Sequence, residues 1–323
     1  MRGQSGLKFV VYLASILAVL ATAIAVKASF DLKRMQARVD EVVNTAVQQA
    51  AADSGEKMES MLQELEEERS RSEAGRSRDL TVKSIAHRGV SGLAPENTLP
   101  AFRLAAEHGF SCVETDIRFT ADGVPVCLHD SSIDRTSNGT GDLSQMTFDE
   151  VRRYDFGAWK SAEFAGTRIP AFEEFIGLCK SLGLHPYIEL KEGTTEQIRD
   201  LVETVNRYGM RGMVSWISFD RNLLNAVRWS DDEARLGLLL SKADTGAVHE
   251  IAALRSGKNL LFLSTCVYSD ELVRQCRNAD LPLEVWVVND ETLLEEMDPY
   301  VTGVTSNGLN YGQFLYQKGM NNG

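Results

Sequence analysis

From Thr81 onward, short apolar runs alternate with longer amphipathic stretches, and this alternation constrains the fold more than any other feature of the sequence. Short apolar runs are typical of strands buried on both faces, and amphipathic stretches such as "TLPAFRLAAEHG" predict helices between them. Repeated strand–helix units over residues 81–323 predict an α/β fold, with a closed (β/α)8 barrel favoured over a doubly wound open sheet. No Gly-x-Gly-x-x-Gly follows a predicted strand, so nothing favours a dinucleotide site.

Nine apolar runs are candidate strands, one more than a barrel of this type needs. In chain order they read "VKSIA", "CVETDI", "VPVCLH", "PYIEL", "VSWISF", "RLGLLL", "LLFLS", "EVWVV" and "GVTS". Only "RFTADG" separates the second run from the third, and its Asp122-Gly123 pair is typical of a hairpin turn. We therefore predict that residues 112–129 form a barrel strand that extends beyond the rim and folds back.

This hairpin predicts a cluster of polar side chains. A turn centred on Asp122 and Gly123 would place Asp116 opposite His129. Side chains alternate between the two faces of a strand, so Glu114 and Asp116 lie on one face. The hairpin is therefore expected to bring two carboxylates and one imidazole together.

Polar residues also occur at the ends of two other predicted strands. His87 and Arg88 follow the first apolar run, and Glu189 and Lys191 alternate at the end of "YIELK". The active sites of such barrels lie at the carboxyl ends of the strands. Clustered carboxylates favour Mg²⁺ or Ca²⁺ over Zn²⁺, Arg and Lys suit a phosphate, and two imidazoles can divide acid and base work. Together they indicate metal-assisted phosphodiester cleavage, whereas the alternative is the ordinary charge of a solvated rim.

Charge and cysteine content argue against two kinds of site. The formal net charge is −12, which argues against a broad nucleic-acid surface and is compatible with a cation site. The five cysteines are scattered and form no Cys-x-x-Cys pair, which argues against structural zinc and against a disulfide framework.

The N-terminal arm predicts a membrane anchor. Residues 9–26 carry no charged side chain and are just long enough for a membrane-spanning helix. A cleaved signal peptide is the alternative, because small residues at 21–25 resemble cleavage sites. We expect residues 1–30 to anchor the chain as a single transmembrane helix, with the barrel on the extracytoplasmic side, or the protein to be secreted if the helix is cleaved.

Residues 31–80 are polar and favour helix, so they predict a stalk and linker before the barrel domain at 81–323. Met35, Val39, Val42 and Ala46 have the four-three-four spacing of a heptad seam. A solvated helical stalk is one interpretation, and a self-associating coiled coil that forms a homodimer is the other.

Eight short motifs follow one another along the predicted barrel: "AHRG", "PENT", "ETDIRFTADGVPVCLHD", "DRTSNGTG", "IPAFEEF", "IELK", "SFD" and "WVVN". On these motifs, the chain from about Lys83 to its C-terminus resembles the glycerophosphodiester phosphodiesterase family. The resemblance implies a TIM barrel with a small insertion after the second-strand hairpin, here residues 130–170. It also implies metal-dependent hydrolysis of a glycerophosphodiester to glycerol 3-phosphate and an alcohol.

The resemblance further implies which residues carry out this chemistry. His87 and His129 look like the catalytic acid–base pair, and Glu114, Asp116 and Glu189 look like the ligands of one divalent cation, Mg²⁺ or Ca²⁺. The sequence leaves open whether the nucleophile is water or the glycerol 2-hydroxyl of the substrate itself.

Other matched positions imply contacts with the substrate. Arg88 would clamp the phosphate, with Lys191 adding positive charge beside it. Phe219 and Trp286 would form an apolar wall against the glycerol moiety. The resemblance thus implies one polar and one apolar side to the substrate site.

Two loop positions are implied to support the site. Glu96 in "PENT" is similar to a residue that acts through hydrogen bonds, and Asn97 lies next to it. The sequence departs from the family after the last strand, where Ser306 and Asn307 stand in place of the common Thr-Asp. This departure concerns the rim around the last strand, not the central cluster.

Other functions remain open on the same scaffold. A lysophospholipase D or a hydrolase of glycerol-phosphate polymer would use the same site, so the substrate is a glycerophosphodiester or a phospholipid-derived molecule. A catalytically inactive, membrane-tethered scaffold is a further alternative, although both histidines and all three carboxylates are present. No nucleic-acid partner is expected.

Overall fold

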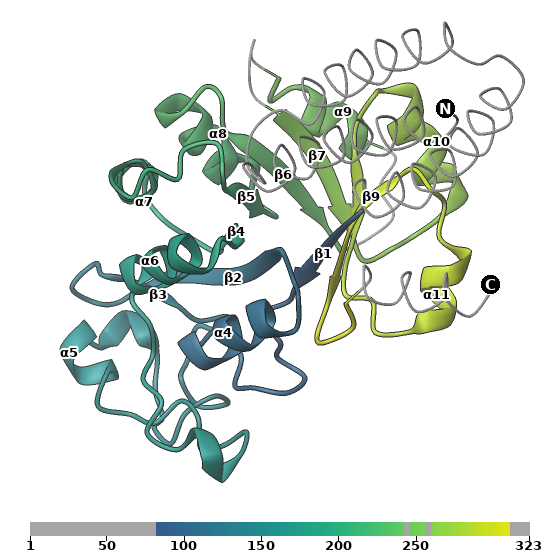
Figure 1. Cartoon of the computed structure of the whole chain (residues 1–323). Coiled ribbons are helices and arrows are strands. Elements are labelled where there is room, and N and C mark those ends of the chain that lie inside the picture. Colours follow the sequence, from purple (N-terminus) through teal and green to yellow (C-terminus); the bar gives the residue numbers. More distant parts are fainter. Residues whose placement is uncertain (1–81, 242–245, 256–259, 311–323) are drawn as a thin grey trace, which may run out of the picture. The chain divides into compact units, whose positions relative to one another are not determined.

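The computed structural model describes residues 82–241, 246–255 and 260–310 (Figure 1). The predicted anchor at 1–30 and the predicted stalk at 31–80, with its homodimer contact, lie outside the described residues. Within the described part, nine strands follow the order of the nine apolar runs.

Eight parallel strands of the described chain form a closed barrel, which confirms the predicted fold. Around the ring the order is β1-β9-β8-β7-β6-β5-β4-β2, and parallel pairing of β1 with β2 closes it. The strands are β1 (Lys83–Ala86), β2 (Cys112–Phe119), β4 (His185–Leu190), β5 (Ser215–Ser218), β6 (Arg235–Leu240), β7 (Leu260–Thr265), β8 (Leu283–Val285) and β9 (Val301–Ser306).

Helices connect successive strands, and their ends follow from local sequence (Figure 1). Thr194 and Gln197 form a reciprocal capping box at the start of α7. Gly183 ends α6 in the left-handed conformation, with a φ of 68°, which glycine adopts without steric cost. The helices are α4 (Leu99–Glu107), α6 (Phe172–Leu182), α7 (Thr195–Arg207), α8 (Arg221–Ser230), α9 (Ala247–Ala252), α10 (Asp270–Asn278) and α11 (Glu291–Glu296).

Apolar side chains pack on both sides of the barrel wall. Outside the wall, strand residues such as Val113 and Ile188 join a core with helix residues, where the Phe102 and Phe175 rings lie 4.7 Å apart between centroids. Inside the wall, a smaller cluster fills the barrel below its carboxyl end. Its members are Ile85, Cys112, Tyr187, Ile217, Leu239 and Phe262.

The predicted hairpin forms, but its register differs by one residue from the prediction. Strand β3 (Pro125–Cys127) pairs antiparallel with β2, and Ile117 lies opposite Cys127. Asp116 therefore faces Leu128, whose backbone N–H donates to the Asp116 carbonyl at 3.0 Å. The prediction that His129 lies opposite Asp116 is wrong.

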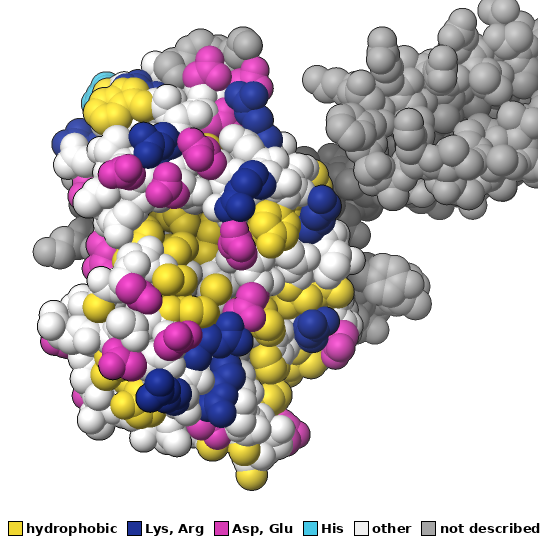
Figure 2. Space-filling view, turned by 90° about the vertical axis from the view of Figure 1, so that its left-hand side faces the viewer, with side chains coloured by type: hydrophobic (Ala, Val, Ile, Leu, Met, Phe, Trp, Pro, Cys, Tyr) yellow, Lys and Arg dark blue, Asp and Glu magenta, His cyan; other side chains and the backbone are white. Residues whose placement is uncertain are grey.

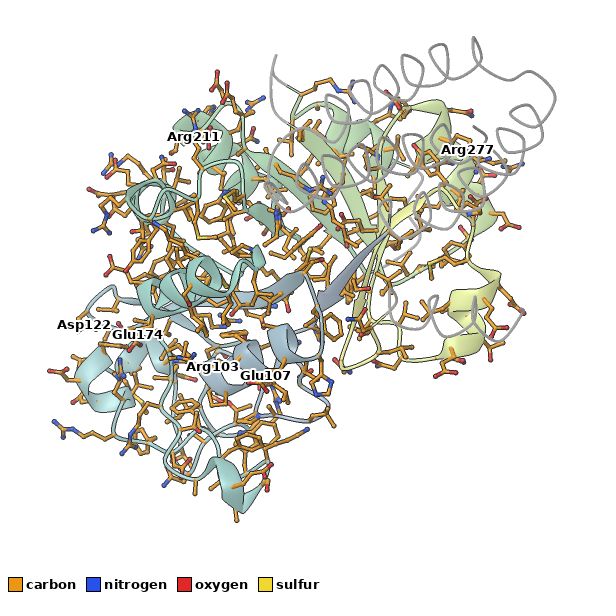
Figure 3. All side chains as sticks on the ribbon, in the orientation of Figure 1. Arg103, Glu107, Asp122, Glu174, Arg211 and Arg277 are labelled. Carbon is orange, nitrogen blue, oxygen red and sulfur yellow. The ribbon has the colours of Figure 1, made fainter. Side chains whose placement is uncertain are left out.

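The turn explains this shift of register. Gly123 N–H donates to the Thr120 carbonyl at 2.9 Å, and Thr120 N–H donates to the Val124 carbonyl at 3.0 Å. Gly123 has a φ of 80°, which is typical of a three-residue loop that ends in a left-handed residue. Figure 3 shows Asp122 at the outer end of the hairpin. The loop is thus one residue longer than the two-residue turn that the sequence suggested.

The segment between β3 and α6 is the predicted insertion, and it lies beside the hairpin (Figure 1). It contains the short helices η1 (Leu143–Gln145), α5 (Phe148–Val151) and η2 (Ala162–Phe164). It also has an apolar core separate from that of the barrel. This core consists of Val126, Leu128, Ile133, Leu143, Val151, Phe156 and Ile169.

We correct the predicted membrane anchor and the extracytoplasmic location that depended on it. Across the described ranges, no helix is long and apolar enough to cross a bilayer, which requires about 20 apolar residues. The apolar segment at 9–26 lies outside those ranges.

On the face shown in Figure 2, acidic and basic side chains lie interspersed around hydrophobic ones.

Candidate active site

An acidic cluster lies toward the carboxyl ends of two neighbouring strands. Glu114 and Asp116 lie on β2 and Glu189 lies on β4, where Asp116 and Glu189 are paired across the two strands. The three side chains offer carboxylate oxygens that all lie within 4.8 Å of one another. Glu114 and Asp116 lie two and four residues beyond Cys112 on β2, and Glu189 lies two residues beyond Tyr187 on β4. All three therefore face inward, above the apolar layer inside the barrel.

The donor set of this cluster fits a hard cation. Glu114 Oε1 and Asp116 Oδ1 are buried and accept no hydrogen bond from the described residues, although Asp116 Oδ1 forms an ion pair with Lys191. Burial, followed by the charges of Asp116 and Glu189, raises the pKa of Glu114 well above its ordinary value. Buried carboxylate oxygens without hydrogen-bond partners are suitable ligands for Mg²⁺ or Ca²⁺. The cluster could therefore hold one metal ion.

Two basic side chains border the cluster. Arg88 Nε lies 3.2 Å from Asp116 Oδ2, and Lys191 Nζ lies 3.2 Å from Asp116 Oδ1. Burial would raise the pKa of Asp116, but the Arg88 and Lys191 charges outweigh burial and hold it well below its ordinary value. Lys191 Nζ also lies 2.7 Å from Glu189 Oε1. Burial, followed by the Asp116 charge, nevertheless raises the pKa of Glu189 to about 7.

The loop after β1 turns Arg88 and Asn97 toward the cluster. Both residues have left-handed backbones, with φ values of 54° and 57°, which are uncommon outside glycine. Arg88 N–H donates to Glu114 Oε2 at 2.8 Å. Asn97 Nδ2 donates to Asp116 Oδ2 at 2.8 Å, and its Oδ1 accepts from Thr115 Oγ1 at 2.8 Å. These hydrogen bonds offset the backbone strain and connect the loop to β2.

His87 follows β1 and contacts the chain after β9. Its backbone N–H donates to the Ser306 carbonyl at 2.8 Å, and its Nδ1 lies 2.7 Å from Asn307 Oδ1. The amide oxygen is an acceptor, so Nδ1 carries the proton and Nε2 keeps a lone pair. Burial, followed by the Arg88 charge, lowers the pKa of His87 to about 4. The imidazole is therefore neutral near pH 7.

His129 follows β3 and is partly exposed. Its Nδ1 lies 2.6 Å from Asp130 Oδ1, and its carbonyl accepts from Arg118 Nε at 2.8 Å. The carboxylate can only accept, so Nδ1 donates and Nε2 is free for a reacting group. Although the register prediction was wrong, the His129 charge contributes to lowering the pKa of Asp116, so the imidazole lies near the cluster.

Two residues that the sequence analysis did not identify connect these parts. Arg135 donates from Nη1 and Nη2 to the Glu96 carboxylate at 2.7 and 2.9 Å, and from Nε to Asp130 Oδ2 at 2.7 Å. Glu96 Oε1 also accepts from Arg88 Nη1 at 2.8 Å. Their positions in the sequence could have indicated a role in the site, because Asp130 follows His129 and Arg135 lies in the "DRTSNGTG" motif.

An aromatic pair lies directly after strands β5 and β8. The Phe219 and Trp286 rings meet edge to face, with 5.8 Å between centroids. Phe219 follows β5 and is exposed, whereas Trp286 packs on the apolar cluster inside the barrel. The two residues that the resemblance implies as an apolar wall therefore lie in contact with each other.

Sequence comparisons cover most of the barrel. A model of the Glycerophosphoryl diester phosphodiesterase family matches residues 87–307. A glycerophosphodiester phosphodiesterase from Caldanaerobacter subterraneus subsp. tengcongensis is 32% identical over 216 residues, which is 66% of this chain and 88% of that protein. Glycerophosphodiester phosphodiesterase 1 from Bos taurus is 44% identical over 112 residues, and the chain spans 34% of its length.

Two solved structures share the fold. A glycerophosphodiester phosphodiesterase from Agrobacterium tumefaciens aligns with a TM-score of 0.60 and 26% identity, covering 73% of this chain and 99% of that one. A phosphodiesterase from Oleispira antarctica, in complex with the product sn-glycerol-3-phosphate, aligns with a TM-score of 0.64 and 25% identity, covering 75% and 98%. The likeness therefore spans nearly the whole of each solved chain.

Proposed function

The chain belongs to the glycerophosphoryl diester phosphodiesterase family, and on that premise we propose that it hydrolyses glycerophosphodiesters to glycerol 3-phosphate and an alcohol. The observation that carries this proposal is the acidic cluster bordered by Arg88 and Lys191, with two imidazoles beside it. The likeness to a phosphodiesterase solved with sn-glycerol-3-phosphate supports the same product for this chain.

Glu114, Asp116 and Glu189 are proposed to hold one divalent cation, either Mg²⁺ or Ca²⁺. Glu114 and Asp116 each supply a buried carboxylate oxygen, and Glu189 supplies a third oxygen within 4.8 Å of them, so the donors are the hard oxygens that both ions prefer. When bound, the cation supplies Lewis-acid stabilisation of the charge that develops on the phosphate. Such a cation would also relieve the repulsion between the three carboxylates.

Arg88 and Lys191 are proposed to bind the phosphate. Arg88 offers a planar fork that matches two phosphate oxygens, and Lys191 offers a compact charge. Both already lie against Asp116, so their cationic groups face the acidic cluster. Phe219 and Trp286 are proposed to contact the carbon skeleton of the glycerol moiety through their rings.

His87 and His129 are proposed to divide the proton transfers. His87 is neutral and has a free Nε2, so it suits the base that takes a proton from the nucleophile. His129 Nδ1 lies 2.6 Å from Asp130 Oδ1, and this contact orients the ring so that Nε2 can give a proton to the leaving oxygen. The nucleophile is water or the substrate's own 2-hydroxyl, and only the second route forms a cyclic phosphate first.

The test is product analysis with the purified full chain on glycerophosphocholine, lysophosphatidylcholine and a glycerol-phosphate polymer. We expect glycerol 3-phosphate and choline from the first substrate, with His129→Ala lowering kcat about 10²- to 10⁴-fold. His249→Ala, in the exposed part of α9, is the control that should keep wild-type turnover. Preferential cleavage of lysophosphatidylcholine or the polymer would reassign the substrate, and turnover of none of them would refute the proposal.

A further inference from the structure

We propose that Arg135 is a positioning residue that holds His129 and Arg88 in one fixed arrangement. The proposal rests on the proposed function, because it assigns those two residues to acid catalysis and phosphate binding. Arg135 belongs to the insertion rather than to the barrel. It lies between two carboxylates, those of Asp130 and Glu96, and each of them contacts one of the two active-site residues.

The first arm of this arrangement runs to His129. Asp130 uses both carboxylate oxygens: Oδ1 lies 2.6 Å from His129 Nδ1, and Oδ2 accepts from Arg135 Nε at 2.7 Å. The contact with Arg135 fixes the orientation of the Asp130 carboxylate. That orientation in turn keeps Nδ1 as the donor to Asp130 and sets where Nε2 points.

The second arm runs to Arg88. Glu96 receives two parallel hydrogen bonds from the Arg135 guanidinium, at 2.7 and 2.9 Å, and its Oε1 accepts from Arg88 Nη1 at 2.8 Å. Arg88 then reaches Asp116 through Nε at 3.2 Å. A rigid Glu96 therefore holds the Arg88 fork in place beside the acidic cluster.

Only an arginine can make this set of contacts. The guanidinium presents several N–H donors in one plane, so it serves two carboxylates at once, whereas a lysine offers a single charge centre. The Arg135 side chain is 46% exposed, so its ion pairs add little to stability. We therefore expect Arg135 to fix the positions of its neighbours. Its positive charge, which lies between the Asp130 and Glu96 carboxylates, also offsets the repulsion between them.

The insertion holds Arg135 at this position. Ile133 is fully buried in the insertion core, and its N–H donates to the Gly141 carbonyl at 3.0 Å. Gly141 N–H donates to Asp134 Oδ1 at 2.7 Å, which closes the turn that carries Arg135. The apolar core of the insertion thus gives the guanidinium a fixed base beside the barrel mouth.

The experiment compares Arg135→Gln and Arg135→Lys with Arg152→Gln in the full-length chain. Arg152 is the matched control, because it is an insertion arginine that pairs with a carboxylate, Glu174, at 2.9 Å. We expect Arg135→Gln to lower kcat on glycerophosphocholine roughly 10- to 100-fold, with a melting temperature close to that of Arg152→Gln. Arg135→Lys should recover part of the loss, because it restores the charge but not the fork.

A second readout needs no substrate. Nitrogen NMR of histidine-labelled protein at pH 7.5 should show His129 Nδ1 protonated and hydrogen-bonded in the wild type, and this Nδ1 signal shifted in Arg135→Gln. Unchanged His129 shifts, or a kcat within twofold of Arg152→Gln, would overturn the proposal. If the wild type cleaves no glycerophosphodiester, the proposed function fails, while the nitrogen shifts still test whether Arg135 orients His129.

Discussion

At the residue scale, the three carboxylates of the acidic cluster differ in the groups that surround them. Asp116 contacts both Arg88 and Lys191. Glu114 accepts a backbone N–H from Arg88 at one oxygen, and its other oxygen accepts no hydrogen bond from the part of the chain that the structure describes. Burial disfavours the charged form of such a carboxylate, and it raises the pKa of Glu114. Glu114 is therefore the side chain whose charge a bound cation would stabilise most.

We predict that Glu114→Gln separates metal binding from folding. In chelator, the variant should melt at or above the wild-type temperature, because the raised pKa of Glu114 shows that its charge is unfavourable in the metal-free fold. The shift in melting temperature on adding Mg²⁺ or Ca²⁺ should disappear, and activity should fall roughly 10- to 100-fold or more. A wild-type metal response in this variant would remove Glu114 from the ligand set.

A second group of polar residues lies where the strands begin, away from the acidic cluster. Tyr187 and Arg235 donate to the buried Glu284 Oε1 at 2.9 and 2.6 Å. His185 Nε2 lies 2.9 Å from Ser215 Oγ. Burial, followed by the Lys83 and Arg235 charges, lowers the pKa of His185 to about 3. The amino end of the barrel thus holds an imidazole that stays neutral.

This imidazole predicts a pH dependence of stability. In the unfolded chain His185 binds a proton near pH 6.5, whereas the folded protein binds it only near pH 3. The unfolded state therefore binds more protons in that window, so stability should fall as the pH decreases from about 6.5 towards 3. His185→Asn should show a shallower loss in denaturant titrations at pH 7, 5.5 and 4.5. Parallel losses in both proteins would exclude this origin.

At the element scale, the sequence predicted every strand but not every register. The nine apolar runs correspond to nine strands in the described residues, because each run is short, apolar and bounded by turn residues. The hairpin register was one residue off, because Asp122-Gly123 suits both a two-residue turn and a three-residue loop. The choice between them depends on hydrogen bonds of Thr120, which no local pattern specifies.

The turn after β1 places Arg88, and it depends on Gly89. A Cβ on Gly89 would lie 2.6 Å from Ala101 Cβ and 2.7 Å from the Ala101 carbonyl carbon, and the residue has a φ of 81°. We predict that, beyond its left-handed strain, Gly89→Ala lowers the free energy of unfolding by about 1–3 kcal/mol through the clash with Ala101, and displaces Arg88, with a marked loss of kcat. Chemical denaturation and steady-state kinetics measure the two effects.

Gly123→Ala is the matched control for this prediction. Gly123 has a nearly identical φ of 80°, but a Cβ there would meet nothing within 4 Å. This variant should incur only the left-handed strain of about 1–2 kcal/mol and keep its kcat. Equal stability and equal kcat in the two variants would show that the contact with Ala101 has no role.

At the scale of the whole molecule, closure of the barrel assembles the site from distant parts of the sequence. His87 and Asn307 lie 220 residues apart in sequence and meet because β1 pairs with β9. Family motifs pointed to His87, His129 and the three carboxylates, yet no motif specified the hydrogen bonds among them. Partners such as Asp130, Arg135 and Asn307 become evident only after closure, because their contacts depend on how the loops pack at the rim.

The proposed metal-dependent hydrolysis is tested most directly by the release of glycerol 3-phosphate from glycerophosphocholine by the full-length protein, before and after metal removal. The proposed site predicts turnover that is lost after exhaustive chelation and restored by Mg²⁺ or Ca²⁺. It also predicts that His129→Ala lowers the metal-restored turnover about 10²- to 10⁴-fold. Undiminished release of glycerol 3-phosphate after chelation, or wild-type turnover by His129→Ala, would contradict it.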